Sequence, residues 1–301
     1  MSALTIDHVS KSFDSVQAVN NLNLDIPEGA VFGLLGPNGA GKTTTIRMIM
    51  DIIIPDQGNI QIFGKPNSQE MRDQIGYLPE ERGLYRKMKV RDILTFLAEM
   101  KGINGNESKK RIELWLERLD LQEWGDKKIE ELSRGMQQKL QFIGTIIHEP
   151  RLIILDEPFT GLDPVNTDMI KDIILELNSK GTTIIFSTHL MEQVEKICKS
   201  ICLINNGEAV LKGELKSIKK DFSKHAIRIA FEGKADFLDD AKLISAYDQK
   251  DSYYDVQLAE GVSTQQIIQS AVKHVQVSHF EILEPSLHDI FIETVTTSEG
   301  E

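Results

Sequence analysis

The sequence predicts an α/β fold in which helices cover both faces of a parallel sheet. Two short runs, 152–155 and 182–186, are apolar on both faces, and a helix predicted over 165–177 separates them. Strands of this kind are typical of a parallel sheet that is buried on both sides. A further buried strand is predicted at 30–35, followed by a helix over 43–54.

Two segments differ from this core in their periodicity. From about residue 88 to 150 apolar residues recur at helical spacing, as in the stripe of Ile112, Trp115, Leu116 and Leu119. After about residue 220 apolar and polar residues alternate, as in 227–231 and 254–258, which is typical of strands with one solvent-exposed face. We therefore expect an α/β domain over 1–218, with a helical subdomain at about 88–150, and a small C-terminal α+β domain over 219–301.

Two helices are predicted within this second domain from their capping residues. Ser263 and Thr264 stand at the start of a segment with apolar residues at helical spacing. Ser286 and Asp289 resemble the two ends of a capping box, which predicts the start of a last helix.

The composition is that of a soluble globular protein. Of the 301 residues 41% are hydrophobic and 27% are charged, and no stretch reaches the ~18 consecutive apolar residues of a membrane-spanning helix. No secretory signal is visible in the sequence. The two cysteines, Cys198 and Cys202, are too few to stabilise a domain of this size by disulfide bonds. We therefore expect buried thiols in a reducing, cytoplasmic compartment. The net charge of −12, without clustered Lys and Arg, argues against a nucleic-acid partner.

A phosphate-binding loop is the most specific motif of the chain. The pattern G-x-x-x-x-G-K-[ST] is matched without a mismatch by Gly36, Pro37, Asn38, Gly39, Ala40, Gly41, Lys42 and Thr43, and Thr44 follows. Glycines let successive backbone N–H groups and the helix N-terminus face an anion. We expect Lys42 to reach the β- and γ-phosphates of a nucleotide and Thr43 to ligate Mg²⁺. A glycine-rich turn without a ligand is the alternative, but folding alone hardly explains the Lys-Thr pair.

Two carboxylates end the predicted strand at 152–155. Asp156 is expected to hold Mg²⁺, and Glu157, one residue on, to act as general base toward an attacking water. The alternative is a pair of solvated acids in a turn. His189 ends the other apolar strand, at the same predicted sheet edge, where its imidazole is expected to contact the γ-phosphate; a lone histidine at a strand end is more often structural.

A second anion-binding helix terminus is predicted far along the chain from the first. Ser133 has the character of a helix N-cap, and with Gly135 it presents donors at that terminus. Two separate phosphate-facing termini in one chain suggest that two chains share each nucleotide. Asp163 precedes another helix, where it can simply be an N-cap.

Taken in this order, the motifs resemble those of the ATP-binding subunits of ABC transporters over roughly residues 3–215. Residues 36–43 match Walker A, and 152–157 match Walker B with its glutamate. Residues 132–136 look like the signature, 161–163 correspond to the D-loop, and His189 corresponds to the switch histidine. Phe13 falls where the family places an aromatic ring that stacks on adenine, although by itself it is more typical of a core residue.

The sequence departs from the family's pattern at two motifs. The signature has Arg134 and Met136 in place of glycine and glutamine, while Ser133 and Gly135 remain. At the position of the Q-loop glutamine the chain has Glu80. The resemblance implies that Glu80 takes part in catalysis and, with Thr43 and Asp156, in holding the metal, although a carboxylate there adds negative charge near the γ-phosphate.

The resemblance implies a P-loop NTPase fold with an ABC ATPase core, and ATP and Mg²⁺ as cofactors. It implies two partners, a second copy of the chain in an ATP-bound head-to-tail dimer and a multi-span membrane permease. That permease would hold the protein at the inner face of the cell membrane. The segments 77–85 and 284–291 look like the sodium-efflux (NatA-type) and YhaQ-like branch of bacterial exporters.

Two alternatives remain open beside the transporter subunit. One is a soluble ATPase of similar architecture that acts on DNA or ribosomes. Such proteins have a long coiled coil before the signature or two cassettes in tandem, whereas residues 44–131 here show no sustained heptads and the motifs occur once. The other is a nucleotide binder that does not hydrolyse, against which Glu157 and His189 argue.

Overall fold

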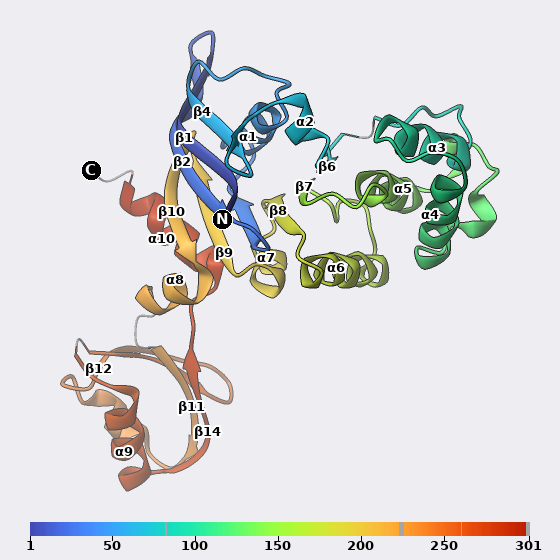
Figure 1. Ribbon diagram of the computed structural model, residues 1–301. Helices are drawn as coiled ribbons and strands as arrows, with labels where there is room; N and C mark the ends of the chain where they lie inside the picture. The colour runs from blue at the N-terminus through green and yellow to red at the C-terminus, as the bar shows by residue number, and fades with distance from the viewer. Residues whose placement is uncertain (82, 223–225, 260, 299–301) are drawn as a thin grey trace. The chain divides into compact units, whose positions relative to one another are not determined.

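The computed structural model describes residues 1–81, 83–222, 226–259 and 261–298. The chain consists of two compact units, Met1–Glu214 and Leu215–Glu301 (Figure 1).

A six-stranded sheet forms the centre of the first unit. Its strand order is β10-β9-β3-β8-β7-β6, with all neighbours parallel except the edge strand β10. The strands are β3 (Val31–Leu35), β6 (Ile75–Leu78), β7 (Leu152–Asp156), β8 (Thr183–Thr188), β9 (Ser200–Asn205) and β10 (Glu208–Glu214). Every residue of β3, β7 and β8 is buried, so the parallel sheet predicted from the apolar runs is confirmed.

A second, antiparallel sheet of this unit has the order β2-β1-β4-β5. It consists of β1 (Ser2–Phe13), β2 (Val16–Pro27), β4 (Gln57–Ile62) and β5 (Lys65–Pro66). Helix α1 (Lys42–Ile49) contributes Ile46, Met48 and Ile49 to one hydrophobic core that also contains residues of both sheets. Helix α1, which directly follows the phosphate loop, is thereby packed against the two sheets.

The helix predicted over 43–54 is too long. Helix α1 ends at Ile49, and Asp51 adopts the left-handed conformation with a φ of 57°. The N–H of Ile52 donates to the carbonyl of Arg47 and the N–H of Asp51 to that of Met48, which is the Schellman pattern of a helix end. Aspartate tolerates this backbone conformation with little cost, so the helix stops before the expected turn at 55–58.

The helical segment lies between β6 and β7 in the sequence. It contains α3 (Val90–Met100), α4 (Gly105–Arg118), the short helices η1 (Gln122–Trp124) and η2 (Ile129–Glu131), and α5 (Arg134–Ile146). Figure 1 shows α3, α4 and α5 grouped together, away from the antiparallel sheet. The predicted stripe on α4 is buried. Three more helices, α2 (Gln69–Arg72), α6 (Pro164–Ser179) and α7 (Met191–Ile197), complete the unit.

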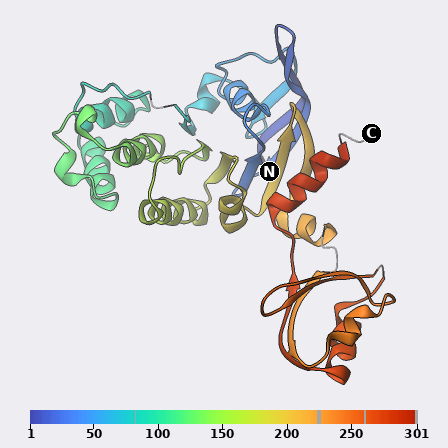
Figure 2. The same cartoon turned by 180° about the vertical axis from the view of Figure 1, so that it is seen from behind.

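The second unit is an α+β structure, as expected. Its antiparallel sheet has the order β12-β13-β11-β14, from β11 (Ala226–Glu232), β12 (Ile244–Gln249), β13 (Tyr254–Leu258) and β14 (Gln276–Leu283). Helix α9 (Thr264–His274) packs on one face of this sheet, with η3 (Ala235–Asp239), around a core that includes Ile227, Val256 and Ile267 (Figure 2). Helices α8 (Leu215–Asp221) and α10 (Leu287–Ser298) flank the sheet in the sequence.

Both predicted caps of this unit are present. Ser263 and Gln266 form a capping box at the start of α9. The Oγ of Ser286 accepts from the N–H of Asp289, whose carboxylate accepts from the N–H of Ser286, at the start of α10. Strand β12 was not predicted, because its residues after Ile244 are exposed and mostly polar.

Candidate nucleotide site

The phosphate loop connects β3 to α1 and depends on glycine for its shape. Gly36 and Gly41 have φ values of 151° and 107°, which L-residues rarely adopt. A Cβ added at Gly36 would collide with the carbonyl oxygen of Ile204, and one at Gly41 with that of Ala18. The glycines therefore allow the loop to pass directly against neighbouring backbone.

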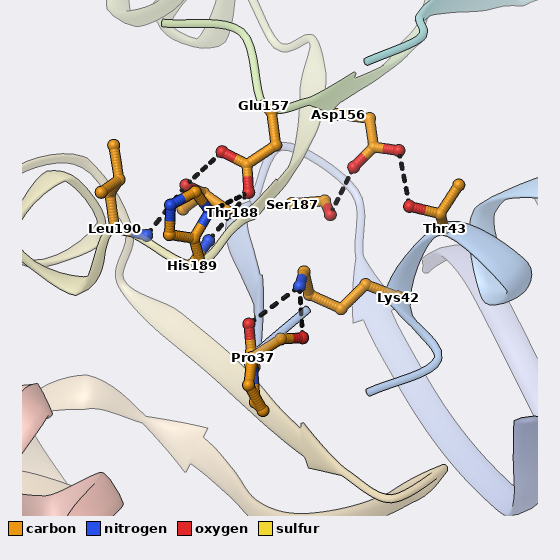
Figure 3. Close-up of polar contacts among 10 residues, drawn as sticks. Pro37, Lys42, Thr43, Asp156, Glu157, Ser187, Thr188, His189 and Leu190 are labelled. Atoms are coloured by element: carbon orange, nitrogen blue, oxygen red, sulfur yellow. Dashed lines mark hydrogen bonds and ion pairs between the residues drawn. The ribbon is translucent and has the colours of Figure 1, made fainter. Parts of the chain in front are cut away.

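Lys42 lies inside the curve of this loop. Its Nζ donates to the carbonyls of Gly36 over 2.8 Å and of Pro37 over 3.0 Å, and the residue is 6% exposed (Figure 3). Burial lowers the pKa of Lys42, while the nearby carboxylates, Glu157 first, act in the opposite direction. The ammonium is thus held inside the loop. An anion bound there would replace the two carbonyls as the hydrogen-bond acceptor of Lys42.

Asp156 is fixed by hydroxyl groups from two elements. Thr43 Oγ1 donates to Asp156 Oδ2 over 3.1 Å, and Ser187 Oγ donates to Oδ1 over 2.7 Å (Figure 3). The carboxylate is 1% exposed, and this burial raises its pKa, against the hydrogen bonds from Ser187 and Thr43, which lower it. A cation next to Asp156 and Thr43 would compensate this buried charge.

Glu157 is turned toward the end of β8. Its Oε2 accepts from Thr188 Oγ1 over 2.9 Å, and its Oε1 accepts from the N–H of His189 over 3.0 Å and lies 2.6 Å from His189 Nδ1. The residue has a φ of 49° in the left-handed region, so the backbone turns sharply directly after β7. Glu157 is 7% exposed, whereas the side chain of His189 is 47% exposed.

One cavity of about 340 Å³ brings most of the predicted residues together. It is lined by Ala18, Asn38, Gly39, Gly41, Lys42, Thr43, Thr44, Glu80, Asp156 and Glu157. His189 does not line this cavity, but it contacts Glu157, which does. Gly36, Pro37 and Ala40 belong to the loop without lining the cavity, and Phe13, Ser133 and Gly135 do not line it.

The oxygen atoms of this cavity suit Mg²⁺. Thr43, Asp156 and Glu80 supply a hydroxyl and two carboxylates, and Mg²⁺ is held in proteins by one or two carboxylates together with substrate phosphates and water. Among the described residues no three His, Cys, Asp or Glu side chains are arranged to hold a metal by themselves. The donor set therefore fits an ion that takes its remaining ligands from a nucleotide.

Ser133 is the N-cap of α5, as predicted. Its Oγ accepts from the N–H of Met136 over 3.2 Å, and the side chain is exposed. Asp163 likewise caps α6, accepting from the N–H of Asn166 over 2.9 Å. The interpretation of Phe13 as a core residue is wrong, because this side chain is 43% exposed at the end of β1, with Lys11 Nζ 5.5 Å from its ring centroid.

A buried polar stripe on α5 was not predicted. Gln138 Nε2 donates to the carbonyl of Pro158 over 3.0 Å, and Gln141 Nε2 lies 3.5 Å from the carbonyl of Glu81. Thr145, one turn further on, donates to the carbonyl of Tyr77 over 3.3 Å. The three residues recur at helical spacing beside the apolar stripe of the same helix, which is the signal that could have revealed them.

These contacts join α5 to the two segments that carry Glu80 and Glu157. Ser187 and Thr188 were also missed as partners of Asp156 and Glu157, although they end a strand that the sequence did predict.

Comparison with known proteins shows the family of the chain. Residues 19–160 match the ABC transporter family, and residues 213–295 match the family described as ATP-binding protein DrrA1-3-like, C-terminal domain. The chain is 46% identical to the uncharacterized ABC transporter ATP-binding protein YhaQ of Bacillus subtilis over 97% of its own length and 98% of that protein. The chain belongs to the ABC transporter ATP-binding proteins.

Other relatives of this family fit the same assignment. The ABC transporter ATP-binding protein NatA of Bacillus subtilis is 34% identical over 77% of the chain and 97% of its own length. The Nod factor export ATP-binding protein I of a Rhizobium species is 37% identical over 71% of the chain and 72% of its own length. A solved ATP-binding subunit of an ABC transporter superposes with a TM-score of 0.69 and 30% identity, covering 73% of the chain and 93% of that structure.

The expected resemblance to the YhaQ- and NatA-like branch is thus confirmed, as are the P-loop fold and the ATPase class. The protein binds and hydrolyses ATP as an ABC ATPase. None of the helices in the described part of the chain has the length and apolar character needed to cross a membrane.

Proposed function

We propose that this ABC ATPase powers a bacterial exporter by closing and opening as a head-to-tail dimer around ATP. The observation that carries the proposal is the cavity in which Lys42, Asp156 and Glu157 meet at the end of the parallel sheet. The ends of such strands are where ligands bind in α/β folds.

Within one chain, different residues of the site bind the phosphates, the metal and the adenine ring. The loop N–H groups and Lys42 bind the phosphates, with Thr44 and Asn38 beside them in the cavity. Thr43, Asp156 and Glu80 hold Mg²⁺, which neutralises the charge on the phosphates when it is bound. Phe13, which is exposed, stacks on the adenine ring.

Glu157 is the general base. Its carboxylate has about four lone-pair sites that can accept hydrogen bonds. Three of these sites are occupied, two at Oε1 by His189 and one at Oε2 by Thr188. Oε2 therefore keeps one site that can take the proton of the attacking water while His189 and Thr188 remain in place. His189 orients the carboxylate through Nδ1 of its ring and through its backbone N–H.

The second copy supplies the other wall of the pocket. Ser133 and Gly135 do not line the cavity of their own chain, but they lie at the N-terminus of the 13-residue helix α5. The Ser133 oxygen accepts from Met136, so its hydroxyl hydrogen is available for an outside oxygen. In a head-to-tail pair this terminus faces the γ-phosphate of the partner.

The permease binds at the helical segment, and this places the protein at the inner face of the cell membrane. Large apolar side chains are exposed there, with Tyr85 at 63%, Phe96 at 43% and Met100 at 67%. Export, rather than import, is supported by the relative named for Nod factor export. The transporter names of the relatives also favour this function over a soluble ATPase acting on DNA or ribosomes.

Mixing two defective variants tests the shared pocket. Lys42→Ala removes the phosphate contact, and Ser133→Asp keeps a good N-cap while placing a negative charge against the phosphate. Each variant alone should be inactive, and a mixture should regain ATPase activity, since a mixed pair contains one intact pocket. Activity of the mixture no higher than that of the separate variants, or full activity of Ser133→Asp alone, would contradict the dimer.

A further inference from the structure

Glu80 leaves the parallel sheet beside the two other carboxylates of the nucleotide cavity. Strand β6 ends at Leu78, which is paired with β7 one residue before Asp156. Because the two strands are parallel, the residues that follow them emerge at the same edge of the sheet. Glu80 lines the cavity together with Asp156, Glu157 and Lys42. Its side chain is exposed, whereas the two other carboxylates are buried.

The backbone on both sides of Glu80 contacts helix α5. Before it, Thr145 Oγ1 donates to the carbonyl of Tyr77 over 3.3 Å. After it, Gln141 Nε2 lies 3.5 Å from the carbonyl of Glu81. Glu80 thus stands between two contacts with one helix, and these contacts hold this segment of the chain beside the cavity.

The charge of Glu80 acts on both the phosphate-binding and the metal-binding group of the cavity. Burial lowers the pKa of Lys42, and the carboxylates of Glu157, Asp156 and Glu80 oppose this shift. Burial raises the pKa of Asp156 against its two hydrogen bonds, and the charges of Glu80 and Glu157 add to that rise. Glu80 therefore lies close enough to repel an anion beside Lys42 and to attract a cation beside Asp156.

A carboxylate at this position differs in its charge from the glutamine of the family's pattern. Both side chains have an oxygen that can ligate Mg²⁺, but only the carboxylate is charged. Its charge attracts the metal and repels the phosphates. ATP without a metal would enter beside the charges of Glu80, Asp156 and Glu157, whereas the metal-bound form brings a cation that compensates them.

We propose that Glu80 makes this cavity select the metal-bound form of ATP and reject the free form. The inference deepens the proposed function, since it rests on the assignment of Glu80 to the metal. Glu80 increases the factor by which Mg²⁺ strengthens nucleotide binding, and by linkage the nucleotide strengthens Mg²⁺ binding by the same factor. The cavity is then kept free of ATP that lacks the metal needed for phosphoryl transfer.

Calorimetry with the non-hydrolysable ATP analogue AMP-PNP tests this selection. The analogue is titrated into the full-length protein once with Mg²⁺ and once with EDTA, and the ratio of the two Kd values measures the effect of the metal. In Glu80→Gln this ratio should be at least about tenfold smaller than in the parent, the effect expected between neighbouring charges. The change should come from tighter binding of the metal-free analogue.

Glu81→Gln is the charge-matched control. It removes an exposed acid one residue further on, outside the lining of the cavity, and should keep the parent's ratio. Both side chains are exposed, so neither variant should alter thermal unfolding. An equal fall of the ratio in both variants would overturn the proposal, because a general loss of negative charge would then explain it.

The two Kd values also separate selection from simple metal binding. An unchanged ratio in Glu80→Gln would overturn the proposal. A ratio that falls only because the Mg²⁺ complex binds more weakly would overturn it too, since Glu80 would then hold the metal without rejecting the free nucleotide. If the parent bound neither form, the nucleotide site itself would be wrong, and this result distinguishes the failure of the proposed function from that of the selection by Glu80.

Discussion

Gln138 Nε2 donates a hydrogen bond to the carbonyl oxygen of Pro158, the residue that follows Glu157, over 3.0 Å. Gln138 is 2% exposed, so neither group has water as an alternative partner. Ser133 is the N-cap of helix α5, which carries Gln138, and we propose that this end of the helix faces the partner's nucleotide. In the dimer that we propose, helix α5 therefore connects the nucleotide pocket of the partner to Glu157, the proposed general base of its own chain.

Gln138→Leu should break the connection between helix α5 and the loop that follows Glu157. The substitution leaves the Pro158 carbonyl buried without a donor, which costs about 1–3 kcal/mol of stability, measurable by urea unfolding. Because the loop after Glu157 loses its support, kcat for ATP should fall while the Kd for ATP in a binding assay stays close to that of the parent. A variant that loses only stability, with unchanged kcat, would limit Gln138 to a structural role.

Lys42→Ala should weaken nucleotide binding itself. A hydrogen bond to a charged group contributes about 1.5–3 kcal/mol, so the Kd for ATP should rise about ten- to a hundredfold. Calorimetry with ATP in the presence and absence of Mg²⁺ measures this change. Lys139→Ala serves as the control, since Lys139 is also buried, on α5, but does not line the cavity. Equal affinity of Lys42→Ala and the parent would contradict the role of the loop.

The sequence predicted the parts of the site that depend on local spacing. The loop from Gly36 to Thr43 and the strand end at Asp156 and Glu157 are continuous segments whose geometry follows from a few neighbouring residues. His189 was placed at the same sheet edge because parallel strands end together, but its direct contact with Glu157 depends on the left-handed turn at Glu157, which composition does not reveal.

The parts that were missed depend on distant packing or on one backbone angle. The helical spacing of Gln138 and Gln141 could have indicated a second buried face of α5, but not their partners, which lie on loops far away in the sequence. The early end of α1 depends on the φ of Asp51, which aspartate adopts only in some contexts. Strand β12 is an edge strand with exposed side chains, and it lacks the alternating pattern by which β11 and β13 were recognised.

Glu157→Gln should remove the general base, while the protein still binds ATP. The amide oxygen can still accept from the N–H of His189, and the amide NH2 can donate to the hydroxyl of Thr188, so the turn after β7 is kept, but the group no longer takes up a proton. The kcat for ATP should fall about 10²–10⁴-fold, the usual effect of losing a general base. Light scattering with ATP should then show a persistent dimer. Turnover at the parent's rate would exclude Glu157 as the base.

Because their thiols are buried, the two cysteines should make the free energy of unfolding decrease at alkaline pH. Burial raises the pKa of the Cys198 and Cys202 thiols to about 12, whereas an unfolded thiol has a pKa of about 8.5. Between these values the unfolded chain loses protons that the folded chain keeps, so the free energy of unfolding falls as pH rises, by up to about 1.4 kcal/mol per pH unit for each thiol. Urea unfolding at pH 7.5, 9 and 10 should show a steeper decline for the parent than for Cys198→Ala with Cys202→Ala, in which only the other groups titrate. Parallel declines would mean that the thiols ionise equally in both states, and Ellman's reagent should then modify them in the folded protein as fast as in urea.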